Sequence, residues 1–352
     1  MSITQQPFGQ LPSGEVVDLF TLTNNKGASV QIITYGATVV SIKVPDRNKE
    51  LADVCLGFPT IDGYLNDDAY IGRTVGRYAN RIAKGSFHLD GKSHYELATN
   101  NGPNHLHGGE KGFSDRIWKA KIEKDDMLTL SIESDNGDEG YPGKVKATVT
   151  YSWNDTKELV IRYHATTDSP TIVGLTNHAY FNLKGEGKGH ILDHELTLNA
   201  SRFLPITGDC IPTGEILSVK NTPFDFTTPN AIGAKIKAKH EQIKHGSGYD
   251  HCFVINRKYN GELVLNAQLY EPTTGRGLDV LSTMPGVQIY SGNWIDSANE
   301  GKHGAKHGKH SGVAIEPEFF PDSPNHPEFA SPTLMPGEEY NHTIVFHFCT
   351  KK

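Results

Sequence analysis

The sequence lacks several features that would assign it to common protein classes. No unbroken apolar run reaches the length that spans a bilayer. Lys and Arg form no runs and the formal net charge is −7, so neither nucleic acid nor an anionic membrane is expected as a partner. Residues 1–10 contain neither a basic segment nor an apolar core, so no secretory signal is predicted.

Cysteines are few, and nucleotide-binding motifs are missing. The four cysteines are far apart and include no Cys-x-x-Cys pair. Because unpaired thiols persist in reducing compartments, we expect a cytoplasmic protein with free, buried cysteines. The chain also has no Gly-rich phosphate loop and no long alternation of strands and helices, which argues against a doubly wound nucleotide-binding fold.

What the chain does contain is a series of short β-branched runs between turn residues, with 36 Gly and 19 Pro. Helical periodicity is scarce, and residues 230–239 predict at most a short helical turn. No linker or change of composition divides the chain. One large, mostly antiparallel β domain with stacked sheets is therefore predicted. Its strands are expected at 30–34, 37–44, 128–133, 144–153, 158–166, 263–269 and 343–348.

The segment 176–183, Thr-Asn-His-Ala-Tyr-Phe-Asn-Leu, alternates between two kinds of side chain. In an extended strand His178 and Tyr180 would share a polar face, and Ala179 and Phe181 would share an apolar one. Imidazole, phenol, hydroxyl and amide groups at fixed spacing suit a small polyhydroxylated ligand. The alternative is an ordinary antiparallel strand with one solvated face.

Two glycine-flanked segments carry further hydrogen-bonding groups. Residues 76–85 place Arg81 beside Asn80, where the guanidinium fork either holds ligand oxygens or faces solvent in an exposed loop. Residues 100–109 place His107 in a loop, two positions after another histidine. No carboxylate or third histidine follows at a metal-ligand spacing, so we predict a hydrogen-bonding or proton-handling histidine and no metal.

Two carboxylates stand at the ends of predicted strands. Asp250 lies where a turn enters the apolar residues 252–255, so it either accepts hydrogen bonds from hydroxyl groups or caps the turn. Glu316 ends the apolar strand 311–316, and Pro317 is expected to break the strand there. This position suits a general base, and it equally suits a salt-bridged edge residue.

Three histidines, His303, His307 and His310, are interleaved with glycines and lysines. A helix would bring them together, but glycine-rich segments are poor helix formers. We therefore predict a mobile, solvated loop and no metal site.

Together these segments resemble the aldose 1-epimerase (mutarotase) family. The resemblance extends over nearly the whole chain and follows the family's order and spacing. The motifs that carry it are ITYGATVVSIKVPDR at 33–47, GRYANRIAKG at 76–85, NNGPNHLHGG at 100–109, TNHAYFNL at 176–183, GYDH at 248–251, PGVQIYSGN at 285–293 and IEPEFFPDSPNHP at 315–327.

The resemblance implies an all-β fold, a large antiparallel β-sandwich of the galactose mutarotase type (a supersandwich) with few short helices. Residues 1–352 are expected to form a single aldose 1-epimerase domain. The implied activity is cofactor-independent interconversion of the α and β anomers of free hexoses such as D-glucose and D-galactose. A non-catalytic sugar-binding module, or an epimerase of hexose 6-phosphates or a disaccharide, is the alternative. A free hexose is the expected partner of a monomer or homodimer.

The resemblance also implies roles for single residues. His178 corresponds to the general acid, Glu316 to the general base and His107 to a residue that polarises the substrate. Pro317-Glu318 departs from the family pattern, because many relatives have Thr-Gln there, and it adds a second carboxylate near the site. The side chains expected to hold the sugar are Asn80, Arg81, His107, Tyr180, Asp250 and Gln288.

Anomer exchange needs one proton removed from the C1 hydroxyl and another delivered to the ring oxygen O5. The C1–O5 bond then opens, the aldehyde rotates, and the ring closes on its opposite face. A positioned acid and base can each contribute roughly 10²–10⁴-fold. We expect the pKa of His178 to be held up and Glu316 to stay ionised, because their mutual attraction favours both charged forms.

Overall fold

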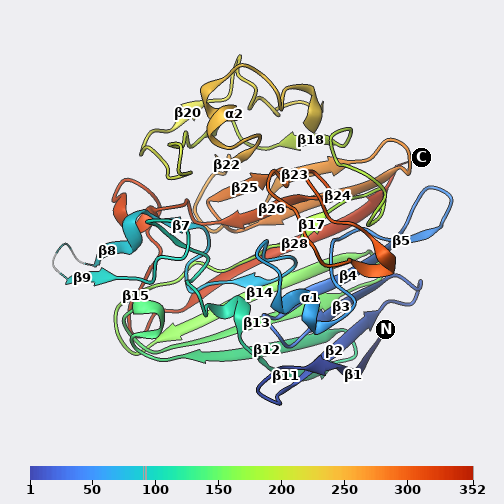
Figure 1. The fold of residues 1–352 in the computed structure, drawn as a ribbon, viewed down its shortest axis with the longest axis horizontal. Helices are drawn as coiled ribbons and strands as arrows, with labels where there is room; N and C mark the ends of the chain where they lie inside the picture. Colours follow the sequence, from blue (N-terminus) through green and yellow to red (C-terminus); the bar gives the residue numbers. More distant parts are fainter. Residues whose placement is uncertain (90, 92, 352) are drawn as a thin grey trace.

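The structure, a computed structural model, describes residues 1–89, 91 and 93–351. Strands dominate it, and they form three large sheets whose neighbouring strands run antiparallel (Figure 1). The predicted all-β class, with few short helices, is confirmed. The two α-helices, α1 (Ile61–Leu65) and α2 (Glu241–His245), have five residues each, and no described helix has the length and apolar character needed to cross a membrane.

A nine-stranded sheet is the largest layer. Its C-terminal strand lies near the middle, so the middle and last thirds of the chain meet in one sheet. In spatial order its strands are β11 (Lys119–Lys124), β12 (Met127–Ser134), β13 (Val145–Trp153), β14 (Glu158–Thr167), β28 (Tyr340–Thr350), β24 (Arg276–Ser282), β23 (Val264–Tyr270), β18 (Glu195–Leu198) and β21 (Asn230–Ala231).

Two further sheets cover one face of this layer. The first contains β1 (Ser2–Gln10), β2 (Val16–Thr23), β3 (Ser29–Ile33), β4 (Thr38–Pro45) and β5 (Leu51–Asp53). The second is ordered β17 (Tyr180–Phe181), β26 (Val313–Glu318), β25 (Gly286–Tyr290), β22 (Asp250–Val254), β19 (Arg202–Phe203) and β20 (Leu217–Ser218).

Short two-stranded sheets and single-turn 3₁₀ helices complete the fold. The paired strands are β6 (Thr74–Val75) with β16 (Thr176–Asn177), β7 (Arg81–Ile82) with β10 (His105–Leu106), β8 (Ser86–Leu89) with β9 (Ser93–Glu96), and β15 (Thr171–Ile172) with β27 (Thr333–Leu334). The 3₁₀ turns are Ala83–Gly85, Phe113–Asp115, Asp138–Gly140, Ile232–Ala234, Lys302–Gly304 and Ser323–Asn325.

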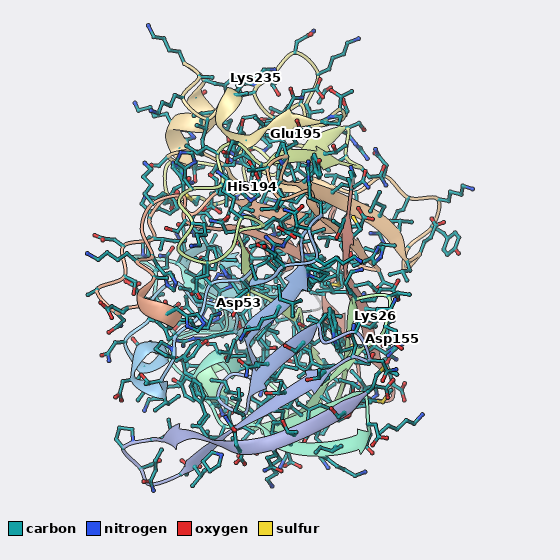
Figure 2. The ribbon with its side chains drawn as sticks, turned by 90° about the vertical axis from the view of Figure 1, so that its right-hand side faces the viewer. Lys26, Asp53, Asp155, His194, Glu195 and Lys235 are labelled. Carbon is teal, nitrogen blue, oxygen red and sulfur yellow. The ribbon has the colours of Figure 1, made fainter. Side chains whose placement is uncertain are left out.

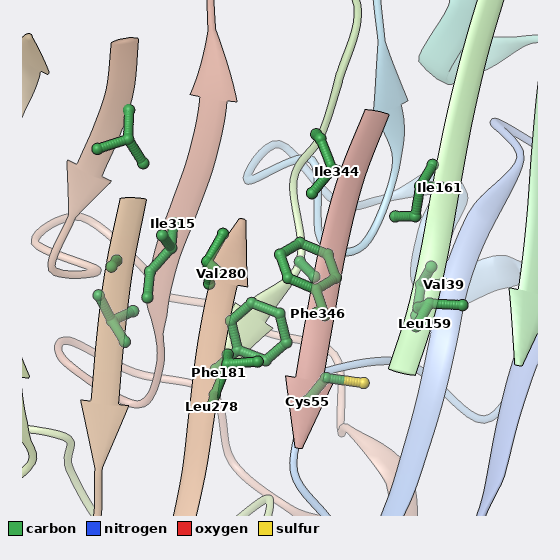
Figure 3. Packing of buried hydrophobic residues seen from close by; sticks show 14 of the residues in the cluster. Val39, Cys55, Leu159, Ile161, Phe181, Leu278, Val280, Ile315, Ile344 and Phe346 are labelled. Atoms are coloured by element: carbon green, nitrogen blue, oxygen red, sulfur yellow. The ribbon is translucent and has the colours of Figure 1, made fainter. Parts of the chain in front are cut away.

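The main hydrophobic core lies between the nine-stranded sheet and the two sheets that cover it. Figure 3 shows Val39 of β4 beside Leu159 of β14, and Phe181 of β17 beside Phe346 of β28. The rings of Phe181 and Phe346 lie 5.0 Å apart in an edge-to-face arrangement. Burying one such side chain contributes about 1.5–3 kcal/mol, so this shared core fixes the position of the six-stranded sheet.

Turns at one end of the molecule tie the five-stranded sheet to the nine-stranded one. The main-chain N–H of Asn25 donates to Asp155 Oδ1 at 2.9 Å, and Asn24 Nδ2 donates to Asn154 O at 3.1 Å. Figure 2 shows the neighbouring Lys26 close to Asp155, where the β2–β3 turn meets the β13–β14 turn.

The prediction of one continuous strand over residues 176–183 is wrong in one respect. Its backbone changes partners at His178: β16 pairs with β6, and β17 pairs with β26. Between them, the His178 N–H donates to Arg73 O at 2.8 Å, and the Gly72 N–H donates to His178 O at 3.0 Å. The alternation itself is confirmed, because Ala179 and Phe181 lie in the core, but the polar face is buried rather than solvated.

The prediction that Pro317 breaks the strand is also wrong. Strand β26 continues through Pro317 to Glu318, and Pro317 lies opposite Val287 of β25. Since β17 pairs only with Val313 and Ala314, its ladder with β26 has ended before Pro317 and loses no hydrogen bond there.

The histidine-rich loop is less solvated than its composition predicts. His303 is exposed as expected, but His307 is buried, with Nε2 2.8 Å from Glu186 Oε1. Lys302 is buried as well, and its ammonium lies 3.1 Å from Asp53 Oδ2 (Asp53 is labelled in Figure 2). The Lys302–Asp53 ion pair anchors the connection between β25 and β26 to the five-stranded sheet, and the His307–Glu186 contact anchors it to the loop after β17.

Candidate active site

One face of the six-stranded sheet carries half of the candidate residues: Tyr180, Asp250, Gln288 and Glu316. Side chains alternate along each strand, and residues directly opposite each other share a face. In this register Gln288 lies opposite Glu316, and Asp250 lies opposite Tyr290. Tyr180 and Tyr290 both lie opposite Ala314, on either side of β26. Their odd-numbered neighbours, such as Val287 and Ile315, enter the core. The alternation that buries one set therefore gathers the other set at one surface.

A short two-stranded sheet supplies the opposite wall. Strand β7 begins at Arg81 and pairs with β10, which ends one residue before His107. Both Asn80, just before β7, and His107, just after β10, have positive φ, at 66° and 50°, so the chain turns sharply at both positions. These turns bring the two segments that stood apart in the sequence against the sheet.

The two walls enclose a cavity of about 300 Å³, a volume suited to a small ligand. All eight side chains predicted from the sequence line it: Asn80, Arg81, His107, His178, Tyr180, Asp250, Gln288 and Glu316. His178, on the bend between β16 and β17, points its Nε2 toward Glu316 Oε2 at 3.4 Å. An imidazole and a carboxyl group thus reach the same small space from neighbouring strands.

The electrostatics of this pair differ from the prediction. Burial lowers the pKa of His178 from 6.5 to about 4, and the charge of Arg73 acts in the same direction. Burial raises the pKa of Glu316 well above 4.5, helped by Glu318 and Asp250, while Arg81 opposes the shift. Desolvation therefore outweighs the attraction between the two groups, and the cleft favours neutral imidazole and neutral carboxyl. The expectation of an ionised pair is wrong for this cleft.

Polar side chains deeper in the cavity hold one another. Gln288 Nε2 donates to Asp250 Oδ1 at 2.6 Å, and Arg81 lies 3.6 Å from the other oxygen of Asp250. Arg81 also donates from Nε to Asn101 Oδ1 at 3.0 Å. Gln288 Oε1 is buried without a hydrogen-bond partner among the described residues. The network is thus pre-ordered and still has acceptor capacity for a ligand hydroxyl.

His107 is fixed in one tautomer. Its Nδ1 accepts the main-chain N–H of Asn80 at 3.1 Å, so the proton of the neutral ring sits on Nε2. Burial lowers the pKa of His107, which keeps the ring neutral. His107, His178 and Glu316 offer atoms within 4.8 Å of one another, close enough to surround a cation. However, a protonated Nε2 has no lone pair for a metal, so this tautomer favours hydrogen-bond donation.

The hydroxyl of Tyr180 is already used, since it donates to Ala69 O at 3.0 Å. Its ring packs 4.9 Å from the ring of His178, so Tyr180 contributes mainly a wall and a support for the imidazole.

Sequence reasoning did not find several residues of the cavity. Tyr70 lies 4.7 Å from the ring of His107 and 6.2 Å from that of His178, measured between centroids. Trp294, which is 51 % exposed, stacks on Tyr290 at the cavity mouth. Tyr70 and Trp294 lie on loops without strand alternation, so no periodic signal marks them. Tyr290 could have been found, because it shares a strand face with Gln288.

This geometry agrees with what comparison with known proteins shows. Residues 18–347 match the family model described as aldose 1-epimerase. The chain is 45 % identical over 349 residues to the galactose mutarotase of Bos taurus, covering 99 % of each chain. It is 37 % identical to the aldose 1-epimerase of Escherichia coli (strain K12), covering 96 % of each.

Solved structures give the same result. An aldose epimerase homologue from C. elegans superposes with a TM-score of 0.86 at 33 % identity, covering 94 % of this chain and 98 % of that one. Galactose 1-epimerase from Lactobacillus acidophilus NCFM superposes with a TM-score of 0.85 at 26 % identity, covering 100 % of both. With a family model and relatives that extend over almost its whole length, the chain belongs to the aldose 1-epimerase family.

Proposed function

We propose that this protein is a mutarotase that interconverts the α and β anomers of free hexoses such as D-galactose and D-glucose. One observation carries the proposal: His178 Nε2 and Glu316 Oε2 lie 3.4 Å apart in a cavity of about 300 Å³ lined by hydrogen-bonding side chains. That spacing lets one acid and one base contact the two oxygens bonded to the same anomeric carbon. The names of the relatives support the reaction and the sugar class.

In the proposed reaction, Glu316 accepts the proton of the C1 hydroxyl while His178 gives a proton to O5. The C1–O5 bond breaks, and its electron pair stays on O5 as the aldehyde forms. The open chain rotates about C1–C2, and the reverse transfers close the ring on the other face. His107, through its Nε2–H, can donate to a sugar oxygen that gains negative charge.

The proton count of the pair matches this chemistry. Ring opening starts from imidazolium and carboxylate and ends with neutral imidazole and carboxylic acid. Both states hold one proton, so no proton needs to enter from solvent during a turnover. Because the buried cleft favours the neutral pair, it favours the protonation state that accompanies the open-chain sugar.

The arrangement of arginines argues against a hexose 6-phosphate as the substrate. Arg73 is buried and paired with Asp67 and Asp115, and Arg77 is buried against Ser134 and main-chain carbonyls. Of the three arginines that are close in sequence, Arg81 lines the cavity. A single guanidinium already next to Asp250 is a poor phosphate site.

Polarimetry tests the proposal. Freshly dissolved α-D-galactose and α-D-glucose should approach anomeric equilibrium faster with the protein than in a buffer blank of the same pH. Binding of galactose in calorimetry without any acceleration would instead support a non-catalytic sugar-binding module. Glucose 6-phosphate and a reducing disaccharide serve as comparison substrates.

The acid limb in the pH profile of kcat/KM should lie at an unusually low pH. The His178–Glu316 pair works with one proton, and it gains a second only as the pH falls toward about 4, the lowered pKa of His178. It loses its proton only above the raised pKa of Glu316. Initial polarimetric rates across the acidic and neutral range will check this, with circular dichroism at each pH to exclude unfolding. An acid limb near 6.5, the ordinary histidine value, would contradict it.

We also propose a cytoplasmic location and a single domain. All four cysteines are unpaired thiols, and three of them are buried, which suits a reducing compartment. The main core takes side chains from strands between β2 and β28, so no segment of the described residues between them has a separate core of that size.

A further inference from the structure

A second carboxyl group, Glu318, lies beside the proposed base. Glu316 and Glu318 are two residues apart on β26, so their side chains leave the same face of the sheet with Cα atoms roughly 6.6 Å apart. Glu316 is 2 % exposed and Glu318 is fully buried. In each, Oε2 is buried and has no hydrogen-bond partner among the described residues. Two buried carboxyl groups therefore lie side by side, Glu316 at the cavity wall and Glu318 behind it.

Glu318 is held in this position. Asn80 Nδ2 donates to Glu318 Oε1 at 2.9 Å, and the main-chain N–H of Asn80 donates to His107 Nδ1. The other end of the Asn80 amide accepts the Arg81 N–H at 2.8 Å. Since Asn80 is itself fixed at both ends, it fixes the Glu318 carboxyl. A glutamine at 318 would retain an acceptor for Asn80 without the acidic group.

The groups around the two carboxyls provide little compensating positive charge. From β22 and β25 they are Asp250, Cys252 and Tyr290; from the β7 and β17 side they are Tyr78, Arg81, His178 and Tyr180. Burial raises the pKa of the cysteine and of the tyrosines, so they stay neutral. Arg81 is the permanent cation of this set, and it is also shared with Asp250.

We propose that Glu318 is a positioning residue for the shuttled proton: its buried carboxyl opposes ionisation of Glu316 and so keeps that proton on the His178–Glu316 pair. The inference rests on the proposed mutarotase function. Once Glu318 is ionised, a second negative charge on the neighbouring buried Glu316 is disfavoured. The pair then retains its proton to a higher pH than Glu316 alone would allow. The raised pKa values of both glutamates agree with this direction.

The test compares the pH dependence of kcat/KM for D-galactose in wild type, Glu318→Gln and Glu318→Leu. In Glu318→Gln the alkaline limb should move to lower pH by at least about one unit, because the neighbouring charge is gone while the contact with Asn80 remains. Glu318→Leu should show the same displacement and, because Asn80 loses its acceptor, a higher KM as well. The exposed Glu215→Gln is the matched control and should leave the limb in place.

A second readout does not depend on turnover. The ¹³C chemical shift of the Glu316 side-chain carboxyl should titrate at lower pH in Glu318→Gln than in wild type. Superimposable pH profiles and titrations for these two proteins would overturn the inference. The role of Glu318 would then be limited to its hydrogen bond with Asn80. A wild-type protein that does not accelerate anomer exchange would overturn the proposed function instead, and the ¹³C titration would still decide whether the two carboxyls are coupled.

Discussion

Replacing Glu316 by Gln should lower kcat for anomer exchange by about 10³-fold. General acid–base groups contribute roughly 10²–10⁴-fold, and an amide cannot accept the proton of the C1 hydroxyl. Glutamine has nearly the same size, so the cavity and KM should change little. The loss is to be measured by polarimetry on α-D-galactose, with the rate of the buffer blank subtracted.

Stability provides the internal control for this variant. Glu316 is 2 % exposed, and its Oε2 has no hydrogen-bond partner among the described residues, so an uncharged amide should not destabilise the fold. The midpoint of thermal unfolding should therefore stay at the wild-type value or rise. The exposed Glu215→Gln should retain full activity. If Glu316→Gln retains the wild-type kcat, the general base is a different group.

Replacing His178 by Asn should lower kcat by about 10²–10⁴-fold, because no group then delivers a proton to O5. Asparagine can still donate a hydrogen bond, but it cannot become a cation at the pH of the reaction. The backbone at this bend is held by hydrogen bonds from the His178 N–H to Arg73 O and from the Gly72 N–H to His178 O, which the substitution retains. The fold should therefore survive.

His303→Asn is the matched control, since His303 is exposed and does not line the cavity. It should leave both kcat and its pH dependence unchanged. If His178→Asn keeps more than a tenth of the wild-type kcat, the proton reaches O5 from a different group, such as the Nε2–H of His107.

The positions of the candidate site residues could be predicted from the sequence to a large extent. Alternation along 285–290 and 311–316 places Gln288 and Glu316 on the face opposite the core, and the structure pairs them across β25 and β26. The placement of Arg81, at the start of β7, and of His107, in a loop, needed the family resemblance, because no local pattern indicates which part of the sheet these segments will face. Tyr70 and Trp294 lie on loops, and neither strand alternation nor the quoted family motifs indicate them.

The wrong predictions have physical causes that the pattern of one strand does not reveal. The change of partner at His178 depends on β6, a strand about a hundred residues earlier in the chain. The pKa directions of His178 and Glu316 depend on burial, which charge pairing alone does not reveal. The role inferred for Glu318 likewise arises from its full burial beside Glu316.

The most direct test is a crystal structure of the wild-type protein with D-galactose bound in the cavity. A carboxyl oxygen of Glu316 should lie about 2.6–3.2 Å from the C1 hydroxyl oxygen, and a ring nitrogen of His178 should lie in the same range from O5. A sugar bound with C1 directed toward Trp294 at the mouth, and with neither contact made, would contradict the account.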